Sequence, residues 1–153
     1  MDSSLMRSDD VGDPYAAGLF RSSPFARKRD VKARLAAILS GRLEERGLNL
    51  VAPISRAVQK NEVLEIIVTD ETTAGPGSGV NRTAYIGFAE IAAGGVLVVG
   101  DEVACGGRVL GRIAGFDETH LPNHLNIVLV GERLSGDELN LALESEITIT
   151  EKR

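Results

Sequence analysis

The chain has 153 residues, of which 43% are hydrophobic and 25% are charged, and its formal net charge is −5. This length is that of one domain with a real core. The acidic balance and an aromatic content of 4% argue against nucleic-acid binding, which favours a basic face and base-stacking rings. With a single cysteine, no membrane-spanning apolar segment and no signal peptide, we expect a cytoplasmic protein with no membrane partner.

Residues 1–27 show no hydrophobic period and are rich in Ser, Asp, Gly and Pro. Such a segment buries little apolar surface. We therefore expect a disordered or loosely packed tail, followed by one folded domain over residues 28–153.

Residues 30–46 have the pattern of an amphipathic helix. Asp30 is a plausible N-cap, and Gly47 suits the position that ends a helix. The apolar residues recur at the spacing of one helical face: Val31, Leu35, Ile38, Leu39 and Leu43. This face is expected to pack on the chain's own sheet, and the competing use is a homodimer contact.

From Leu48 onward the hydrophobic period changes to two, which is typical of strands. Short strand-like runs follow one another, separated by tight glycine turns such as Gly106-Gly107. The expected fold is all-β, a small antiparallel β-barrel of about six to eight strands preceded by the helix. Cys105, beside that turn, is expected to be a surface or rim residue.

Residues 116–126, FDETHLPNHLN, hold both histidines and the densest group of polar side chains. Three interpretations compete: a metal site, a general acid–base site, and a turn whose polar groups only satisfy the backbone. Pro122 disfavours a helix through His120 and His124, so their spacing does not favour a metal site. We therefore expect neither a metal ion nor another cofactor.

The acid–base hypothesis assigns a role to each polar residue. His120 or His124 supplies a proton or hydrogen bond to a substrate carbonyl or enol, because the unperturbed pKa of histidine is near ~6.5. Asp117 or Glu118 orients that histidine. The substrate-binding side chains are expected to be Thr119, Asn123, Asn126, Tyr85 and Phe88. The loop is expected at the open end of an aliphatic cavity lined by Val96, Val98, Ile113 and Ile127.

From about Ala84 to Gly131 the chain resembles the glucitol/sorbitol-specific IIA component of the bacterial phosphotransferase system. The shared features are Gly100-Asp101-Glu102-Val103, a glycine-rich turn, and V-x-G-x-I-A at Val109–Ala114. The resemblance implies a small all-β barrel. It places that family's phosphorylated histidine in the strand 85–90, where this chain has Phe88 and no histidine.

These observations together favour a cofactor-free enzyme for a small apolar molecule, of the cyclase, cycloaddition or isomerase type found in secondary metabolism. Such reactions need a shaped cavity and one or two hydrogen-bonding groups. The alternatives are a relative of the IIA sugar phosphocarriers and a non-catalytic ligand-binding module. An open cavity would favour the enzyme, and a filled interior would favour the binding module.

Overall fold

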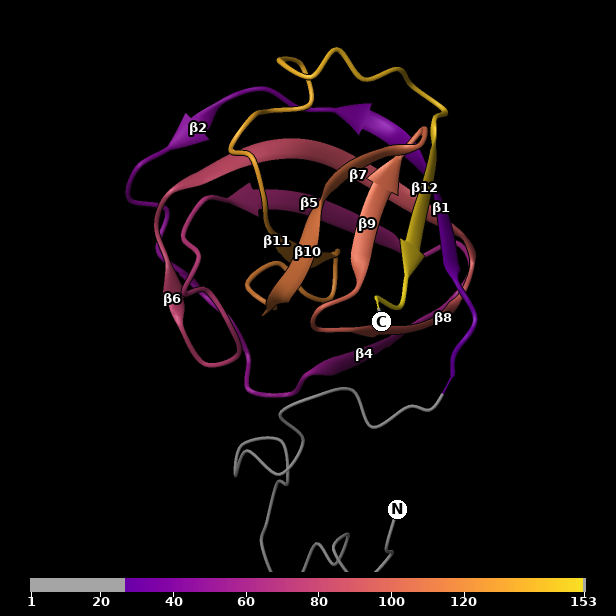
Figure 1. Ribbon diagram of the computed structural model, residues 1–153, viewed down its shortest axis with the longest axis horizontal. Coiled ribbons are helices and arrows are strands. Elements are labelled where there is room, and N and C mark those ends of the chain that lie inside the picture. The colour runs from indigo at the N-terminus through magenta and orange to yellow at the C-terminus, as the bar shows by residue number, and fades with distance from the viewer. Residues whose placement is uncertain (1–26, 153) are drawn as a thin grey trace, which may run out of the picture.

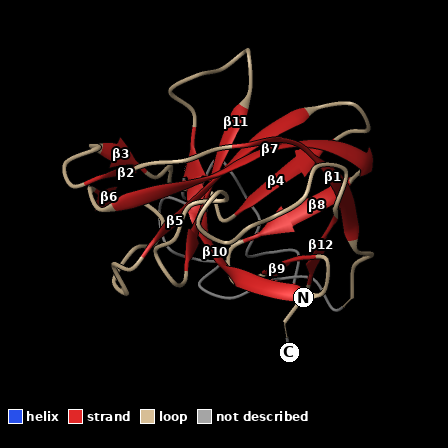
Figure 2. Cartoon of the chain, turned by 90° about the horizontal axis from the view of Figure 1, so that it is seen from above, coloured by secondary structure: helices blue, strands red, loops and turns tan. Residues whose placement is uncertain are grey.

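The computed structural model describes residues 27–152 (Figure 1). The tail expected over residues 1–27 lies outside the described residues, except for residue 27. Every regular element in the described part is a β-strand, and Figure 2 shows strands joined by loops. Accordingly, none of the described segments is a helix long and apolar enough to cross a membrane.

The strands follow one another closely along the chain. In order they are β1 (Val31–Ile38), β2 (Arg42–Leu43), β3 (Leu48–Asn49), β4 (Ser55–Val58), β5 (Val63–Thr69), β6 (Gly79–Val80), β7 (Thr83–Ala93), β8 (Gly95–Val98), β9 (Glu102–Cys105), β10 (Arg108–Asp117), β11 (Leu125–Val130) and β12 (Glu146–Thr150).

The main sheet closes on itself. Its eight strands run in the order β1-β12-β9-β10-β11-β5-β7-β2, and β1 also pairs with β7. All but β2 therefore form a ring of seven strands, a number within the expected range. Two small sheets, β3-β6 and β4-β8, complete the described part of the fold (Figure 2).

One pair in the ring runs parallel, so the expectation of a purely antiparallel sheet is wrong there. β11 lies beside β5 with Leu125 level with Leu64, and both strands point the same way. The chain between them forms β6 to β10, which provides the long crossover that parallel neighbours need.

The predicted helix over residues 30–46 is also wrong, since its residues form β1 and β2. Val31 and Leu35 are four apart, as on a helix face, but with Ala33 they also alternate as on a strand face. All three are at most 1% exposed and face the interior of the ring. Hydrogen bonds from β12 on one side and β7 on the other hold β1 extended. The homodimer contact expected on the helix face therefore loses its basis.

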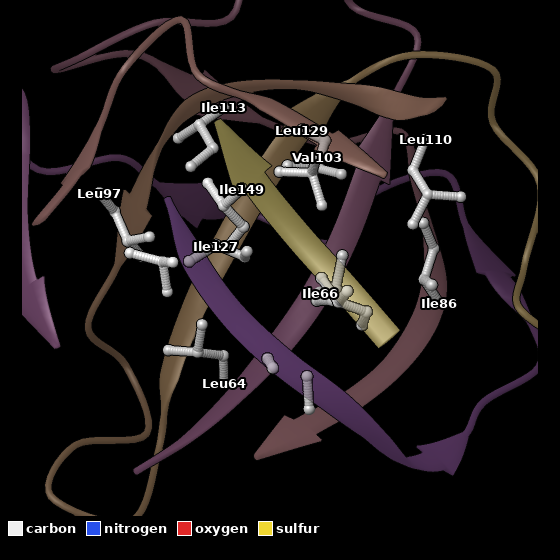
Figure 3. Close-up of a cluster of buried hydrophobic side chains, with 14 of the residues drawn as sticks. Leu64, Ile66, Ile86, Leu97, Val103, Leu110, Ile113, Ile127, Leu129 and Ile149 are labelled. Carbon is white, nitrogen blue, oxygen red and sulfur yellow. The ribbon is translucent and has the colours of Figure 1, made fainter. Parts of the chain in front are cut away.

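Apolar side chains fill the interior of the ring (Figure 3). Ile113 and Ile127, which we expected to line a cavity, pack into this core with Ile66, and each is at most 2% exposed. The β8 residue that joins them is Leu97; Val98 is buried outside this cluster and Val96 is half-buried. Of the expected cavity walls, Ile113 and Ile127 thus belong to the packed core, whereas Val96 and Val98 do not.

Cys105 belongs to the same core and is 4% exposed, so its expected place at the surface or rim is wrong. It is the last residue of β9, paired with Ile147 of β12, and the turn that follows it consists of Gly106 and Gly107. Burial raises the pKa of its thiol above the ordinary value.

A second, smaller apolar cluster lies on the outer side of the ring. Leu48 and Leu50 pack there against Ile67 of β5, Ala114 of β10 and Val128 of β11. The amide of Val51 donates to the carbonyl of Phe116 at 2.9 Å, which fixes the segment next to the end of β10. This covering segment forms one border of the site described next.

Candidate functional site

A row of side chains crosses four neighbouring strands on the outer face of the ring. Asp117 of β10 is level with Asn126 of β11, Asn126 with Glu65 of β5, and Glu65 with Phe88 of β7. Asn126 and Glu65 each stand between two residues of the interior core, so their side chains point outward. The loop of residues 118–124 joins β10 to β11 beside this row.

His124 lies at the centre of the site. Its Nε2 is 3.0 Å from Oε1 of Glu65, and its Nδ1 is 2.8 Å from Oδ1 of Asn123. The side chains of His124 and Glu65 are 12% and 10% exposed. Both ring nitrogens therefore face oxygen acceptors, whereas a neutral imidazole carries one N–H. The geometry favours a positive charge between His124 and Glu65, either a proton or a bound cation.

His120 and Phe88 complete the surroundings of His124. The ring of Phe88 meets the His124 ring edge-on, with centroids 5.0 Å apart and an interplanar angle of 89°. The exposed ring of His120 is tilted by 31° to that of His124, also at 5.0 Å between centroids. A metal ion could be held here, because three side chains each offer one ligand atom and these atoms all lie within 4.8 Å of one another. Among the described residues, the group consists of Glu65, His120 and His124.

Asp117 anchors the loop and does not contact the histidines through any of its hydrogen bonds. Its Oδ1 accepts from the amide of Thr119 at 3.0 Å and from Nδ2 of Asn126 at 3.1 Å, and its Oδ2 accepts from the amide of Asn49 at 3.2 Å. Burial raises the pKa of Asp117, but the hydrogen bonds from Thr119, Asn49 and Asn126 outweigh burial, so the net pKa lies below the ordinary 3.8. Asp117 is therefore ionised, and both of its carboxylate oxygens accept hydrogen bonds.

The other expected site residues divide between the cluster and its surroundings. Glu118 forms an ion pair with Arg56 of β4 and is 42% exposed, so this carboxylate holds the loop to β4. The backbone amide of Thr119 donates a hydrogen bond to Asp117. Tyr85 packs on the outer apolar cluster, away from the row. Asn123 and Phe88 touch His124 directly.

Asn126 leaves one polar atom unexplained. The residue is 0% exposed, and its Oδ1 has no hydrogen-bond partner among the described residues. Buried acceptors are nearly always paired, so an orphaned one indicates a missing partner.

Glu65 is the site residue that sequence reasoning missed. It lies in the strand Val63–Thr69, VLEIIVT, 59 positions before His124. A signal was present, because a carboxylate within an otherwise apolar strand needs a partner when the strand is buried.

The fold and the cluster define an all-β protein with a histidine–carboxylate site on the outside of a closed ring of strands. The chain belongs to DUF6917, a family of unknown function whose model matches residues 25–150. No curated protein and no solved structure matches it. The function is therefore inferred from the site itself.

Proposed function

We propose that the protein is a cytoplasmic small-molecule enzyme of the isomerase or cyclase type, built on a small, filled β-barrel. Its reacting groups are His120, His124 and Glu65 on the outer face, and they polarise a carbonyl or enol oxygen of the substrate. The observation that carries the proposal is that both ring nitrogens of His124 face oxygens, at 2.8 and 3.0 Å. A positive charge held at this point is an electrophile for such an oxygen.

The packing of the interior changes the expected substrate. Because the aliphatic side chains of the ring fill it, an apolar molecule enclosed in the barrel has little support. The substrate instead binds between the loop 118–124 and the start of β5, where the exposed ring of His120 is accessible. A small polar molecule with one oxygen directed at the cluster fits this position.

The test begins with ligand discovery, since the reaction is unknown. Small carbonyl and enol compounds are screened by thermal shift, and each hit is assayed for turnover. His124→Ala and Glu65→Gln should lower turnover by about 10²-fold, the usual scale for a lost acid–base group. Glu132→Gln is the matched control, because this exposed carboxylate lies just beyond the opposite end of β11. Equal loss in the control, or none in the two site variants, would refute the proposed site.

A second candidate, a relative of the phosphotransferase-system IIA proteins, is favoured by one contact. The sequence resemblance places the phosphorylated histidine of that family at Phe88, and the His124 ring lies edge-on against Phe88. In this reading a ring nitrogen of His124 attacks phosphorus, forming an N–P bond while the bond to the donor's leaving group breaks. Treatment with phosphoramidate should then give acid-labile phosphohistidine by ³¹P NMR, and His124→Ala should abolish it.

A third candidate is a non-catalytic ligand-binding module, which the filled interior favours. It predicts that hits from the same screen bind with dependence on His124 but are recovered unchanged after long incubation with the protein.

A further inference from the structure

We infer that Glu65, His120 and His124 bind one divalent transition-metal ion, of the zinc class, on the outer face of the ring. The proposed metal site uses the same residues as the proposed function. It rests on that function only for the role of the ion, which would polarise the oxygen atom of the substrate. Three observations on different atoms lead to it: the convergence of the ligands, the orientation of His124, and the orphaned oxygen of Asn126.

The first observation is the convergence of the ligand atoms. In a tetrahedral zinc site with bonds of ~2.1 Å, neighbouring ligand atoms are about 3.4 Å apart. The Nε2 of His124 and Oε1 of Glu65 are already 3.0 Å apart, and the three ligand atoms lie within 4.8 Å of one another. Because the His120 side chain is exposed, a small rotation can bring it to bonding distance without disturbing the core.

The second observation is the orientation of the His124 ring. The Nδ1 of His124 lies 2.8 Å from Oδ1 of Asn123 and its Nε2 lies 3.0 Å from Oε1 of Glu65. In the tautomer in which Nδ1–H donates to Asn123, the lone pair of Nε2 is directed at Glu65. Metal-bound histidines usually donate their other ring N–H to an oxygen in this way. A nitrogen lone pair opposite a carboxylate oxygen repels it, and a cation between the two removes the repulsion.

The third observation is the buried Oδ1 of Asn126. The Nδ2 of this amide donates to Asp117 on β10 at 3.1 Å, so Oδ1 is directed to the other side, where Glu65 is its level partner on β5. It has no partner among the described residues. The partner that this oxygen lacks therefore belongs on the side of the amide that faces Glu65.

The donor set decides the class of metal. Two imidazoles with one carboxylate suit zinc and neighbouring transition metals, and three protein ligands leave a position open for water or substrate. Calcium and magnesium require more oxygen ligands than the cluster offers. Our sequence expectation of no metal rested on helical spacing of the histidines. This site does not use that spacing, because its ligands come from the loop 118–124 and from β5.

The test is direct titration of the full chain after treatment with a chelator. Zn²⁺ is followed by calorimetry and Co²⁺ by its visible absorption, without any substrate. We expect one ion per chain, and we expect Glu65→Gln, His120→Ala and His124→Ala each to weaken binding at least about 10-fold, the lower end for loss of even a supporting group. Glu132→Gln should bind as the parent does.

Nitrogen-detected NMR of the histidine rings provides a second readout. Zn²⁺ should shift the Nε2 resonance of His124 and leave its Nδ1 protonated. His120→Ala serves as the variant least able to disturb folding, since its side chain is exposed. Substoichiometric binding, or binding that survives all three ligand substitutions, would overturn the inference.

The failures of the two proposals are distinguishable. If no metal binds but His124→Ala still abolishes turnover, the site works with a proton and the metal inference falls. If one metal binds through the three ligands but no compound is turned over, the metal site stands and the enzyme proposal falls.

Discussion

Replacing Asp117 by alanine should destabilise the protein strongly, because this carboxylate holds three chain segments together. It accepts hydrogen bonds from Asn49, Thr119 and Asn126 and is 2% exposed. A hydrogen bond to a charged group contributes about 1.5–3 kcal/mol. Water can replace the carboxylate at the two partly buried amides but not at the buried Asn126, so we expect a loss of about 3–5 kcal/mol in the free energy of unfolding.

Urea unfolding followed by far-ultraviolet circular dichroism measures this loss, since the chain has no tryptophan to report by fluorescence. Asp137→Ala is the matched control, because that carboxylate is exposed, and it should change stability by no more than about 0.5 kcal/mol. A loss at Asp117 no larger than at the control would refute the anchoring role.

The pH dependence gives an independent check on the same residue. Because the folded-state pKa of Asp117 lies below 3.8, its ionised form contributes stability that is fully present above 3.8. That contribution is lost as the pH falls through the lower, folded-state pKa. The stability difference between the parent and Asp117→Asn should therefore shrink in strong acid. A difference that stays constant from neutral pH to well below 3.8 would contradict the assignment.

Three further predictions concern the rest of the fold. Gly136→Ala should cost about 1–3 kcal/mol, because an added Cβ would overlap the carbonyl oxygen of Ile86, while Gly75→Ala, which meets open space, should be nearly neutral in thermal melts. Cys105 should resist a soluble disulfide reagent until urea unfolds the chain, since it is 4% exposed; rapid labelling of the native protein would contradict its burial. Ile66→Ala, at 0% exposure, should lower the unfolding free energy by about 2–5 kcal/mol, and a loss under ~1 kcal/mol would mean that the interior is less tightly filled.

The strand pattern after Leu48 was readable because alternation is a local property, and the all-β class followed from it. The helix prediction for residues 31–38 fails because Val31, Leu35 and Ile38 have the spacing of a helix face. The alternation that would indicate a strand depends on Ala33, whose small side chain adds little to a hydrophobic pattern. What keeps the segment extended is pairing with β12 and β7, from residues far along the chain. Such pairing overrides the local conformational preference of a segment, and it cannot be predicted from the sequence of that segment alone.

The site shows the same division between local and distant information. His120, Asn123 and His124 were found because they are neighbours in one polar loop. Glu65 was missed because a parallel pairing of β5 with β11 brings it to His124, and nothing in the loop sequence specifies that register. Asp117 was recognised as a loop carboxylate, but one of its three hydrogen-bond donors is the amide of Asn49. Only the fold places Asn49 beside Asp117.

The position of β12 between β1 and β9 has a consequence for how the protein is made in the cell. β1 is the first described strand to leave the ribosome, yet one of its edges is bonded by β12, at the far end of the described chain. Until residues 146–150 emerge, β1 and β9 both present unpaired backbone groups, which recruit other chains. Ring closure therefore waits until β12 has been synthesised, and a chain that lacks β12 exposes two strand edges that make it a natural client for chaperones.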